Sequence, residues 1–234
     1  MLVLDLKNCR FTQGEFTLNA DFTVEPGQKL AIIGPSGGGK STLIAGLAGF
    51  LPPAVGDILW QGAPMPPHPG DRPMTVLFQD HNLFPHLTVL QNVTLGIAPG
   101  LRPNAAQKQA VLDALGQVGL ATRATARPAE LSGGEQGRVA LARVLLRKRP
   151  VLLLDEPFAA LGPALKDEML NTLGDVVDST QATVLMVTHD PDDARRFADQ
   201  VILVADGMAH APVETRAIFA HPPRSLAAYL GVRG

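Results

Sequence analysis

The chain carries two kinds of hydrophobic pattern, and each predicts a different class of strand. Near the N-terminus, residues 2–6 and 16–24 alternate apolar and polar side chains, as half-buried antiparallel strands do. Elsewhere apolar residues follow one another without interruption, which is typical of strands buried on both faces of a sheet. These runs are 29–33, 151–154, 183–187 and 201–204, with shorter strand signals at 57–60 and 75–78. The pattern predicts an α/β core that also carries an antiparallel part.

Helical patterns lie between these strands. Residues 41–50 predict an apolar helix that a Pro-Pro pair ends, and residues 163–177 predict an amphipathic helix. Residues 215–230 predict a pair of short helices. Strands and helices that alternate in this way favour the α/β class.

The segment from Asp80 to Ala129 differs from the sequence on either side of it. It is helical, it is interrupted by loops, and it lacks convincing strands. Asn104 and Gln107 have the spacing of a helix cap, so a helix is expected to begin there and to run to Gly119. We interpret this region as a helical subdomain inserted into the core. The predicted boundaries are 80–146 for the helical subdomain and 1–79 with 147–234 for the core and an antiparallel β subdomain.

Length and composition further limit the possible fold and partners of the chain. The 234 residues suffice for one large domain, or one domain with a smaller lobe, and 46% hydrophobic content suits a packed core. A net charge of −2 gives no overall basic surface, so no nucleic-acid partner is expected. Cys9 is the single cysteine, which excludes an internal disulfide. Neither a membrane span nor a signal peptide is evident, so we expect a soluble, intracellular chain.

A glycine-rich loop joins the first buried strand to the apolar helix, and it fits the phosphate-loop pattern G-x-x-x-x-G-K-[ST] in full. Its residues are Gly34, Pro35, Ser36, Gly37, Gly38, Gly39, Lys40, Ser41 and Thr42. Such a loop directs backbone N–H groups and the positive end of a helix at one point, where a phosphate binds. Lys40 is expected to reach the β- and γ-phosphates, and the Ser41 hydroxyl to hold Mg²⁺.

Polar residues also follow two of the buried strands. Asp155 and Glu156 come directly after residues 151–154, at the strand end where open α/β sheets place their chemistry. Asp155 suits a role near Mg²⁺, and Glu156 suits orienting a water for attack on the γ-phosphate. His189 follows residues 183–187, immediately before a strong helix start. A lone histidine there is more often structural, but a phosphate loop in the same chain favours a functional one.

A second glycine-rich helix start lies in the predicted helical subdomain. Ser132 and Glu135 have the spacing of a capping box. Gly133 and Gly134 fall in the first turn, where each weakens a helix by about 0.8–1 kcal/mol relative to alanine. The glycines do not help the helix to form, whereas bare backbone at a helix N-terminus is a surface that binds anions.

Five motifs in one order resemble the ATPase subunit of an ABC transporter over nearly the whole chain. The phosphate loop resembles Walker A, Gln79 the Q-loop, LSGGE the family signature, VLLLDEP Walker B, and His189 the switch histidine. The resemblance implies a P-loop NTPase fold with a RecA-like core sheet. It also implies a head-to-tail homodimer that holds two ATP molecules, each between Walker A of one subunit and the signature of the other.

The same resemblance implies a role for each motif residue. Catalytic roles fall to Lys40, Gln79, Glu156 and His189, and Mg²⁺ contacts to Ser41, Gln79 and Asp155. ATP would be bound by the Walker A residues, by Phe11 stacked on adenine, and by Ser132, Gly133, Gly134 and Glu135 acting across the dimer. One position departs from the family pattern: Gly162 stands where the loop after Walker B usually has an aspartate.

The implied partners are a second copy of the chain and a membrane permease, which the helical subdomain near Gln79 would contact. A periplasmic solute-binding protein would act indirectly, and the chain would lie peripherally at the cytoplasmic face of the bacterial inner membrane. The segment around LFQDHNLFPHLTV and the short length resemble the ATPase subunits of bacterial thiamine importers most closely. Iron(III), sulfate and polyamine importers are the near alternatives.

Three other classes remain to be compared. A soluble ABC ATPase acting on DNA or ribosomes usually carries coiled-coil insertions or two tandem units, which this sequence lacks. A nucleotide kinase shares the phosphate loop but has no use for LSGGE. An inactive scaffold would not need intact Lys40, Asp155, Glu156 and His189.

Overall fold

A computed structural model describes residues 3–80 and 82–231. It contains one mixed sheet with strands in the order β5-β4-β1-β2-β10-β9-β3-β8-β7-β6, and β11 pairs with β9. The strands are β1 (Leu4–Gln13), β2 (Phe16–Val24), β3 (Lys29–Ile33), β4 (Val55–Trp60), β5 (Ala63–Pro64), β6 (Met74–Leu77), β7 (Val151–Asp155), β8 (Thr183–Val187), β9 (Gln200–Ala205), β10 (Met208–Ala209) and β11 (Val213–Glu214). The predicted α/β class with a phosphate-loop core is confirmed.

The two kinds of strand lie in two parts of the sheet. The uninterrupted apolar runs form the parallel part, in which β3 pairs with β8 and β9, and β7 pairs with β6 and β8. The alternating segments form the antiparallel part, in which β1 pairs with both β2 and β4. Parallel strands are buried on both faces and antiparallel ones on one face, so the burial of each part follows its sequence pattern.

Strand β1 is longer than predicted because its alternation is interrupted. The prediction ended at residue 6, whereas the strand continues to Gln13. Its pairing with β2 shifts register between Leu6 and Cys9, and Asn8 has φ 49° at this bulge. An extra residue in one strand moves the following side chains to the other face, which breaks a period-2 pattern. Leu2, the first residue of the predicted strand, lies outside the described residues.

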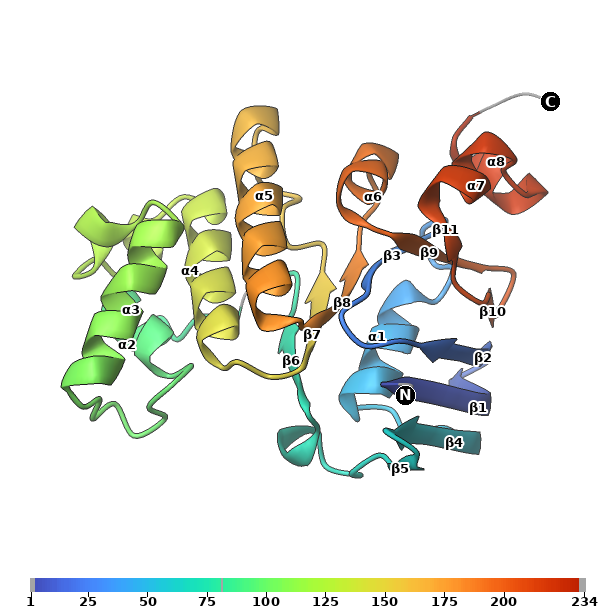
Figure 1. The fold of residues 1–234 in the computed structure, drawn as a ribbon, viewed down its shortest axis with the longest axis horizontal. Coiled ribbons are helices and arrows are strands. Elements are labelled where there is room, and N and C mark those ends of the chain that lie inside the picture. Colours follow the sequence, from blue (N-terminus) through green and yellow to red (C-terminus); the bar gives the residue numbers. More distant parts are fainter. Residues whose placement is uncertain (1–2, 81, 232–234) are drawn as a thin grey trace.

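Helices cover the sheet and also form a group of their own (Figure 1). They are α1 (Lys40–Ala48), α2 (Val89–Thr94), α3 (Ala105–Gln117), α4 (Gly133–Leu146), α5 (Pro163–Thr180), α6 (Pro191–Phe197), α7 (Thr215–Ala220) and α8 (Arg224–Tyr229). Helices α2, α3 and α4 share a core of their own at one end of the molecule, and the antiparallel strands lie toward the other end. No described helix is long and apolar enough to cross a membrane.

Helix boundaries follow local capping chemistry. Asn104 accepts a hydrogen bond from the backbone N–H of Gln107, and the Gln107 side chain accepts one from the Asn104 backbone N–H, both at 2.9 Å. This capping box confirms the predicted start of α3, which ends at Gln117, two residues before the predicted end. Helix α5 runs three residues beyond its predicted end, to Thr180. The two predicted C-terminal helices are confirmed as α7 and α8.

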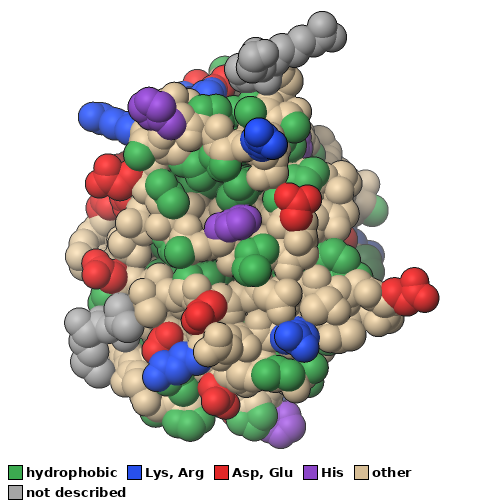
Figure 2. Space-filling model, turned by 90° about the vertical axis from the view of Figure 1, so that its right-hand side faces the viewer, with side chains coloured by type: hydrophobic (Ala, Val, Ile, Leu, Met, Phe, Trp, Pro, Cys, Tyr) green, Lys and Arg blue, Asp and Glu red, His purple; other side chains and the backbone are tan. Residues whose placement is uncertain are grey.

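The C-terminal helices α7 and α8 lie at the same end of the molecule as the antiparallel strands, and this end faces the viewer in Figure 2. On this face the Lys, Arg, Asp and Glu side chains are scattered among hydrophobic ones, and its described residues form no continuous basic patch. The distribution agrees with the net charge of −2.

Candidate functional site

The phosphate loop connects β3 to α1, and close contacts require glycine at both of its ends. A Cβ on Gly34, which has φ 152°, would lie 2.0 Å from the carbonyl oxygen of Val204. Gly39 has φ 106°, and a Cβ there would lie 2.8 Å from the Phe16 ring. Gly39 is also the N-cap of α1 and makes no side-chain capping hydrogen bond. The first N–H groups of α1 therefore have no side-chain acceptor at the cap and can bind an anion.

Lys40 lies folded back over this loop. Its ammonium group donates hydrogen bonds to the carbonyl oxygens of Gly34 at 2.8 Å and Pro35 at 2.9 Å. Burial lowers the pKa of Lys40, while the nearby charges of Glu156 and Asp155 act in the opposite direction. The lysine is thus held at the loop, within electrostatic reach of both carboxylates.

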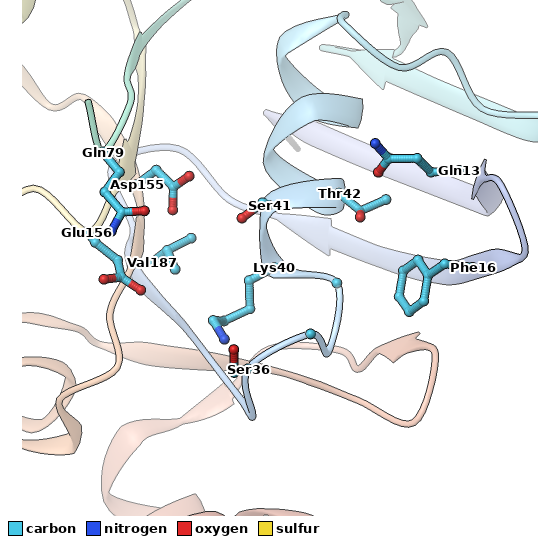
Figure 3. Close-up of a pocket in the computed structure, with 12 residues that line it drawn as sticks. Gln13, Phe16, Ser36, Lys40, Ser41, Thr42, Gln79, Asp155, Glu156 and Val187 are labelled. Carbon is cyan, nitrogen blue, oxygen red and sulfur yellow. The ribbon is translucent and has the colours of Figure 1, made fainter. Parts of the chain in front are cut away.

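A cavity of about 620 Å³ opens above the loop (Figure 3). It is lined by Gln13, Phe16, Ser36, Gly37, Gly39, Lys40, Ser41, Thr42, Gln79, Asp155, Glu156 and Val187. Phe16 and Gln13 lie on one side of the loop, and Gln79, Asp155 and Glu156 lie on the other, at the ends of β6 and β7. The structure therefore brings the predicted loop, amide and carboxylate residues to one place.

Asp155 and Glu156 occupy different environments. Burial raises the pKa of Asp155, the charge of Glu156 raises it further, and Lys40 lowers it. Glu156 has φ 48°, a conformation that non-glycine residues seldom adopt, and its backbone N–H donates to the carbonyl of Val187 at 3.1 Å. The turn after β7 thereby aims the Glu156 side chain into the cavity.

His189 lies beside Glu156, because the two residues follow the neighbouring parallel strands β8 and β7. Its Nδ1 is 3.0 Å from Oε2 of Glu156. The imidazole is 61% exposed, whereas the Glu156 side chain is 21% exposed, so the pair lies at the rim of the cavity. His189 itself does not line the cavity.

The predicted signature residues form the start of α4. Ser132 Oγ accepts a hydrogen bond from the Glu135 N–H at 3.2 Å, and Glu135 accepts one from the Ser132 N–H at 2.8 Å, which confirms the capping box. These bonds to Ser132 hold the pKa of Glu135 below its usual range. A Cβ on Gly134 would lie 2.7 Å from Leu161, so this helix end packs against the segment that precedes α5. None of the four predicted signature residues, Ser132, Gly133, Gly134 and Glu135, lines the cavity at Lys40.

One predicted site residue is wrong. Phe11 has no exposed surface and lies beneath α1, where a Cβ on Gly46 would come within 2.4 Å of its ring. A base cannot reach a ring that the core covers. The aromatic side chain that lines the cavity is Phe16, the first residue of β2, accompanied by Gln13, the last residue of β1. Its position directly after the β1–β2 turn is the sequence feature that distinguishes Phe16 from Phe11.

Gly162, the departure from the family pattern, is the N-cap of α5. It makes no side-chain capping hydrogen bond, and a Cβ added there would meet nothing within 4 Å. Its φ of −69° and ψ of 159° are accessible to any residue. The structure therefore offers no steric reason for glycine at this position.

Comparisons with known proteins agree with this geometry. A sequence profile of the ABC transporter family matches residues 17–159. A thiamine import ATP-binding protein of Cereibacter sphaeroides is 60% identical over 98% of this chain and 100% of its own length, and one of a Ruegeria species is 50% identical over the same shares.

Solved structures show the same architecture. The dimeric structure of a bacterial ABC transporter cassette is similar with a TM-score of 0.79 and 30% identity, covering 91% of this chain and 99% of that one. A dimeric post-hydrolysis state of an ATP-binding cassette with ADP and phosphate has a TM-score of 0.77 and 29% identity, with the same coverage.

Proposed function

Because the chain belongs to the ABC transporter family, we propose that it hydrolyses ATP to energise the import of thiamine through a membrane permease. The observation that carries the proposal is the single cavity that joins a phosphate loop to strand-end carboxylates and an aromatic side chain. The phosphate loop suits the triphosphate of a nucleotide, and the aromatic side chain suits its base. The carboxylates suit the hydrolysis of the triphosphate. The relatives at 50–60% identity are thiamine import ATP-binding proteins, which supports thiamine as the cargo.

At the loop, the backbone N–H groups from Gly37 to Thr42 hold the β- and γ-phosphates. Lys40 exchanges its two carbonyl acceptors for phosphate oxygens, which carry more charge and accept stronger hydrogen bonds. Phe16 stacks on the adenine at the other end of the cavity, with Gln13 beside it.

The cavity also offers a set of oxygen donors that suits Mg²⁺. The Ser41 hydroxyl, the Asp155 carboxylate and the Gln79 amide line the same space. Mg²⁺ is usually held by one or two carboxylates together with substrate phosphates, and no cluster of three or more His, Cys, Asp or Glu among the described residues would hold a metal alone. These three residues and the phosphates would hold the ion, which neutralises charge on the transferred phosphoryl group.

Hydrolysis requires a water molecule placed in line with the γ-phosphate. Glu156 accepts a hydrogen bond from this water and orients it. The water oxygen bonds to the γ-phosphorus while the bond from that phosphorus to the bridging oxygen of ADP breaks, so that ADP leaves and a water proton passes to Glu156. His189 holds the Glu156 carboxylate through its Nδ1 contact and faces the γ-phosphate from the rim. Gln79 lies on the same side of the cavity as Glu156 and links the site to the segment that follows β6.

The second half of the site comes from another copy of the chain. Ser132, Gly133, Gly134 and Glu135 do not reach the cavity of their own chain, yet they form a glycine-fronted helix start suited to phosphate. In a head-to-tail dimer they meet the γ-phosphate on the partner. ATP then binds the closed dimer more strongly than the open one. Only such a difference in affinity can shift the equilibrium toward the closed dimer.

The surface near Gln79 suits a permease. A second cavity of about 480 Å³ is lined by Phe78, Gln79, Asp80, Asn82 and Asp155. The Phe50 ring lies 5.6 Å from the Phe78 ring, and Phe84 follows Asn82 by two positions in the sequence. Phe50 is 57% exposed and Phe84 46%. Exposed aromatic side chains beside a hollow are typical of protein docking sites. The chain would thus lie peripherally at the cytoplasmic face of the inner membrane.

The proposal is tested by reconstituting the chain in proteoliposomes with the permease and the solute-binding protein of the same bacterium. We expect ATP hydrolysis to rise when the binding protein is loaded with thiamine, and not when it is offered sulfate or iron(III). Glu156→Gln serves as the inactive control. Stimulation by another solute would refute the cargo, transfer of phosphate to an acceptor other than water would identify a kinase, and absence of ATP hydrolysis would refute the function.

A further inference from the structure

The last helix of the chain reaches the site through one hydrogen bond. The Tyr229 hydroxyl at the end of α8 donates to the backbone carbonyl of His189. Tyr229 is the single tyrosine in the sequence, and its ring packs against the core that α6, α7 and α8 share. A residue 40 positions away from His189 thus contacts the peptide that carries the imidazole.

Helix α8 is held firmly enough to act as a support. Leu226 of α8 and Ile218 of α7 are buried in one cluster with Ala194 of α6. The Thr215 hydroxyl at the start of α7 donates to the carbonyl of Ala198 at 2.7 Å. The Arg195 guanidinium lies 4.3 Å from the centre of the Phe219 ring, which joins α6 to α7 a second time.

Other bonds fix the residues on both sides of His189. Thr188 donates to Asp193 at 2.8 Å and accepts from the Asp190 N–H at 3.0 Å. Lys166 of α5 donates to Asp190 at 2.7 Å. These contacts hold the neighbours, whereas the carbonyl of His189 itself is held by Tyr229.

We propose that Tyr229 is a positioning residue for ATP hydrolysis, which fixes the His189 peptide so that the imidazole meets Glu156. The inference rests on the proposed function. An imidazole that is 61% exposed has little packing to orient it, so its direction depends on the backbone that carries it. Without the bond from α8, the imidazole is free to turn away from Glu156.

The Tyr229 hydroxyl is suited to this role because it stays protonated and can donate a hydrogen bond. Burial raises the pKa of Tyr229, and the negative charges of Glu156 and Asp190 raise it further. The hydroxyl therefore keeps its proton throughout the neutral range and can donate to a carbonyl oxygen.

The test uses Tyr229→Phe, which keeps the ring and removes the hydroxyl. We expect kcat for ATP hydrolysis to fall roughly 2- to 12-fold, the range that one hydrogen bond provides, with the KM for ATP unchanged. The NMR signals of the His189 ring, identified by their loss in His189→Ala, are expected to shift. The signals of His210, which lines a separate cavity beneath α7 and α8, are expected to stay in place.

Ser225→Ala is the matched control, because it removes a hydroxyl from the same helix at the wall of that separate cavity. It is expected to leave kcat and the His189 signals unchanged. Tyr229→Phe with wild-type kcat, or with unchanged His189 signals, would overturn the inference, and so would an equal effect of Ser225→Ala. If the wild-type chain fails to hydrolyse ATP, the proposed function fails instead.

Discussion

Phe16 is the residue whose position most directly distinguishes a nucleotide site from a phosphate site. It faces the cavity at the turn between β1 and β2, beyond the phosphate loop, and Gly39 leaves room for its ring. A ring face next to an otherwise polar cavity offers a stacking surface to a base. Phe11 lies on the same pair of strands but belongs to the core beneath α1.

Phe16→Ala is therefore expected to weaken ATP binding. Stacking of a base on an aromatic side chain contributes about 1–3 kcal/mol, which corresponds to a roughly 5- to 150-fold rise in Kd. Isothermal titration calorimetry of Phe16→Ala, with inorganic triphosphate as the control ligand, measures this change. Triphosphate affinity should be unaffected, because the phosphate loop is untouched, and an equal loss for both ligands would contradict a stacking role.

Sequence reasoning was most successful where chemistry is local. The capping boxes at Asn104 and Ser132 formed as expected, because a cap depends on residues three positions apart. Phe11 was assigned wrongly because burial depends on helix α1, which packs over it from a distant part of the chain. The sequence does not predict the contact between Tyr229 and His189, because the two residues are 40 positions apart and nothing near Tyr229 in the sequence indicates it.

At the scale of elements, α1 packs against the antiparallel strands closely enough for a single added methyl group to test the contact. Gly46 lies on the face of α1 that presses on Phe11, and a Cβ would come within 2.4 Å of the ring. Core positions that are already filled tolerate extra volume poorly, because side chains must leave their rotamers to admit it. Phe11 belongs to one buried cluster with Leu43 and Leu47 of α1.

Gly46→Ala is expected to destabilise the chain by about 1–3 kcal/mol, the usual cost of overpacking. Gly174→Ala in α5 is the matched control: a Cβ there meets nothing within 4 Å, so the substitution should stabilise by up to about 1 kcal/mol through helix propensity alone. Urea unfolding of the nucleotide-free proteins gives both values. If the two variants changed stability in the same direction, the close contact between α1 and Phe11 would be contradicted.

At the scale of the whole molecule, the two predicted parts of the nucleotide site lie apart within one chain. The phosphate loop, Asp155 and Glu156 line one cavity, and the capped start of α4 is outside it. The order of the motifs along the chain predicted this pair of surfaces, because each forms from a short contiguous stretch. The arrangement of two copies in a dimer depends on contacts between chains. The hydrophobic pattern of one chain therefore does not predict it.

We propose that ATP is held between the phosphate loop of one copy and the start of α4 of another. This proposal is tested by the mass of Glu156→Gln in solution, measured by light scattering with and without saturating Mg-ATP. We predict a monomer without nucleotide or with Mg-ADP and a dimer with Mg-ATP. Adding Lys40→Ala should abolish the dimer, because the triphosphate is no longer held. A Glu156→Gln protein that binds Mg-ATP yet remains monomeric, and also fails to close against its permease, would contradict the account.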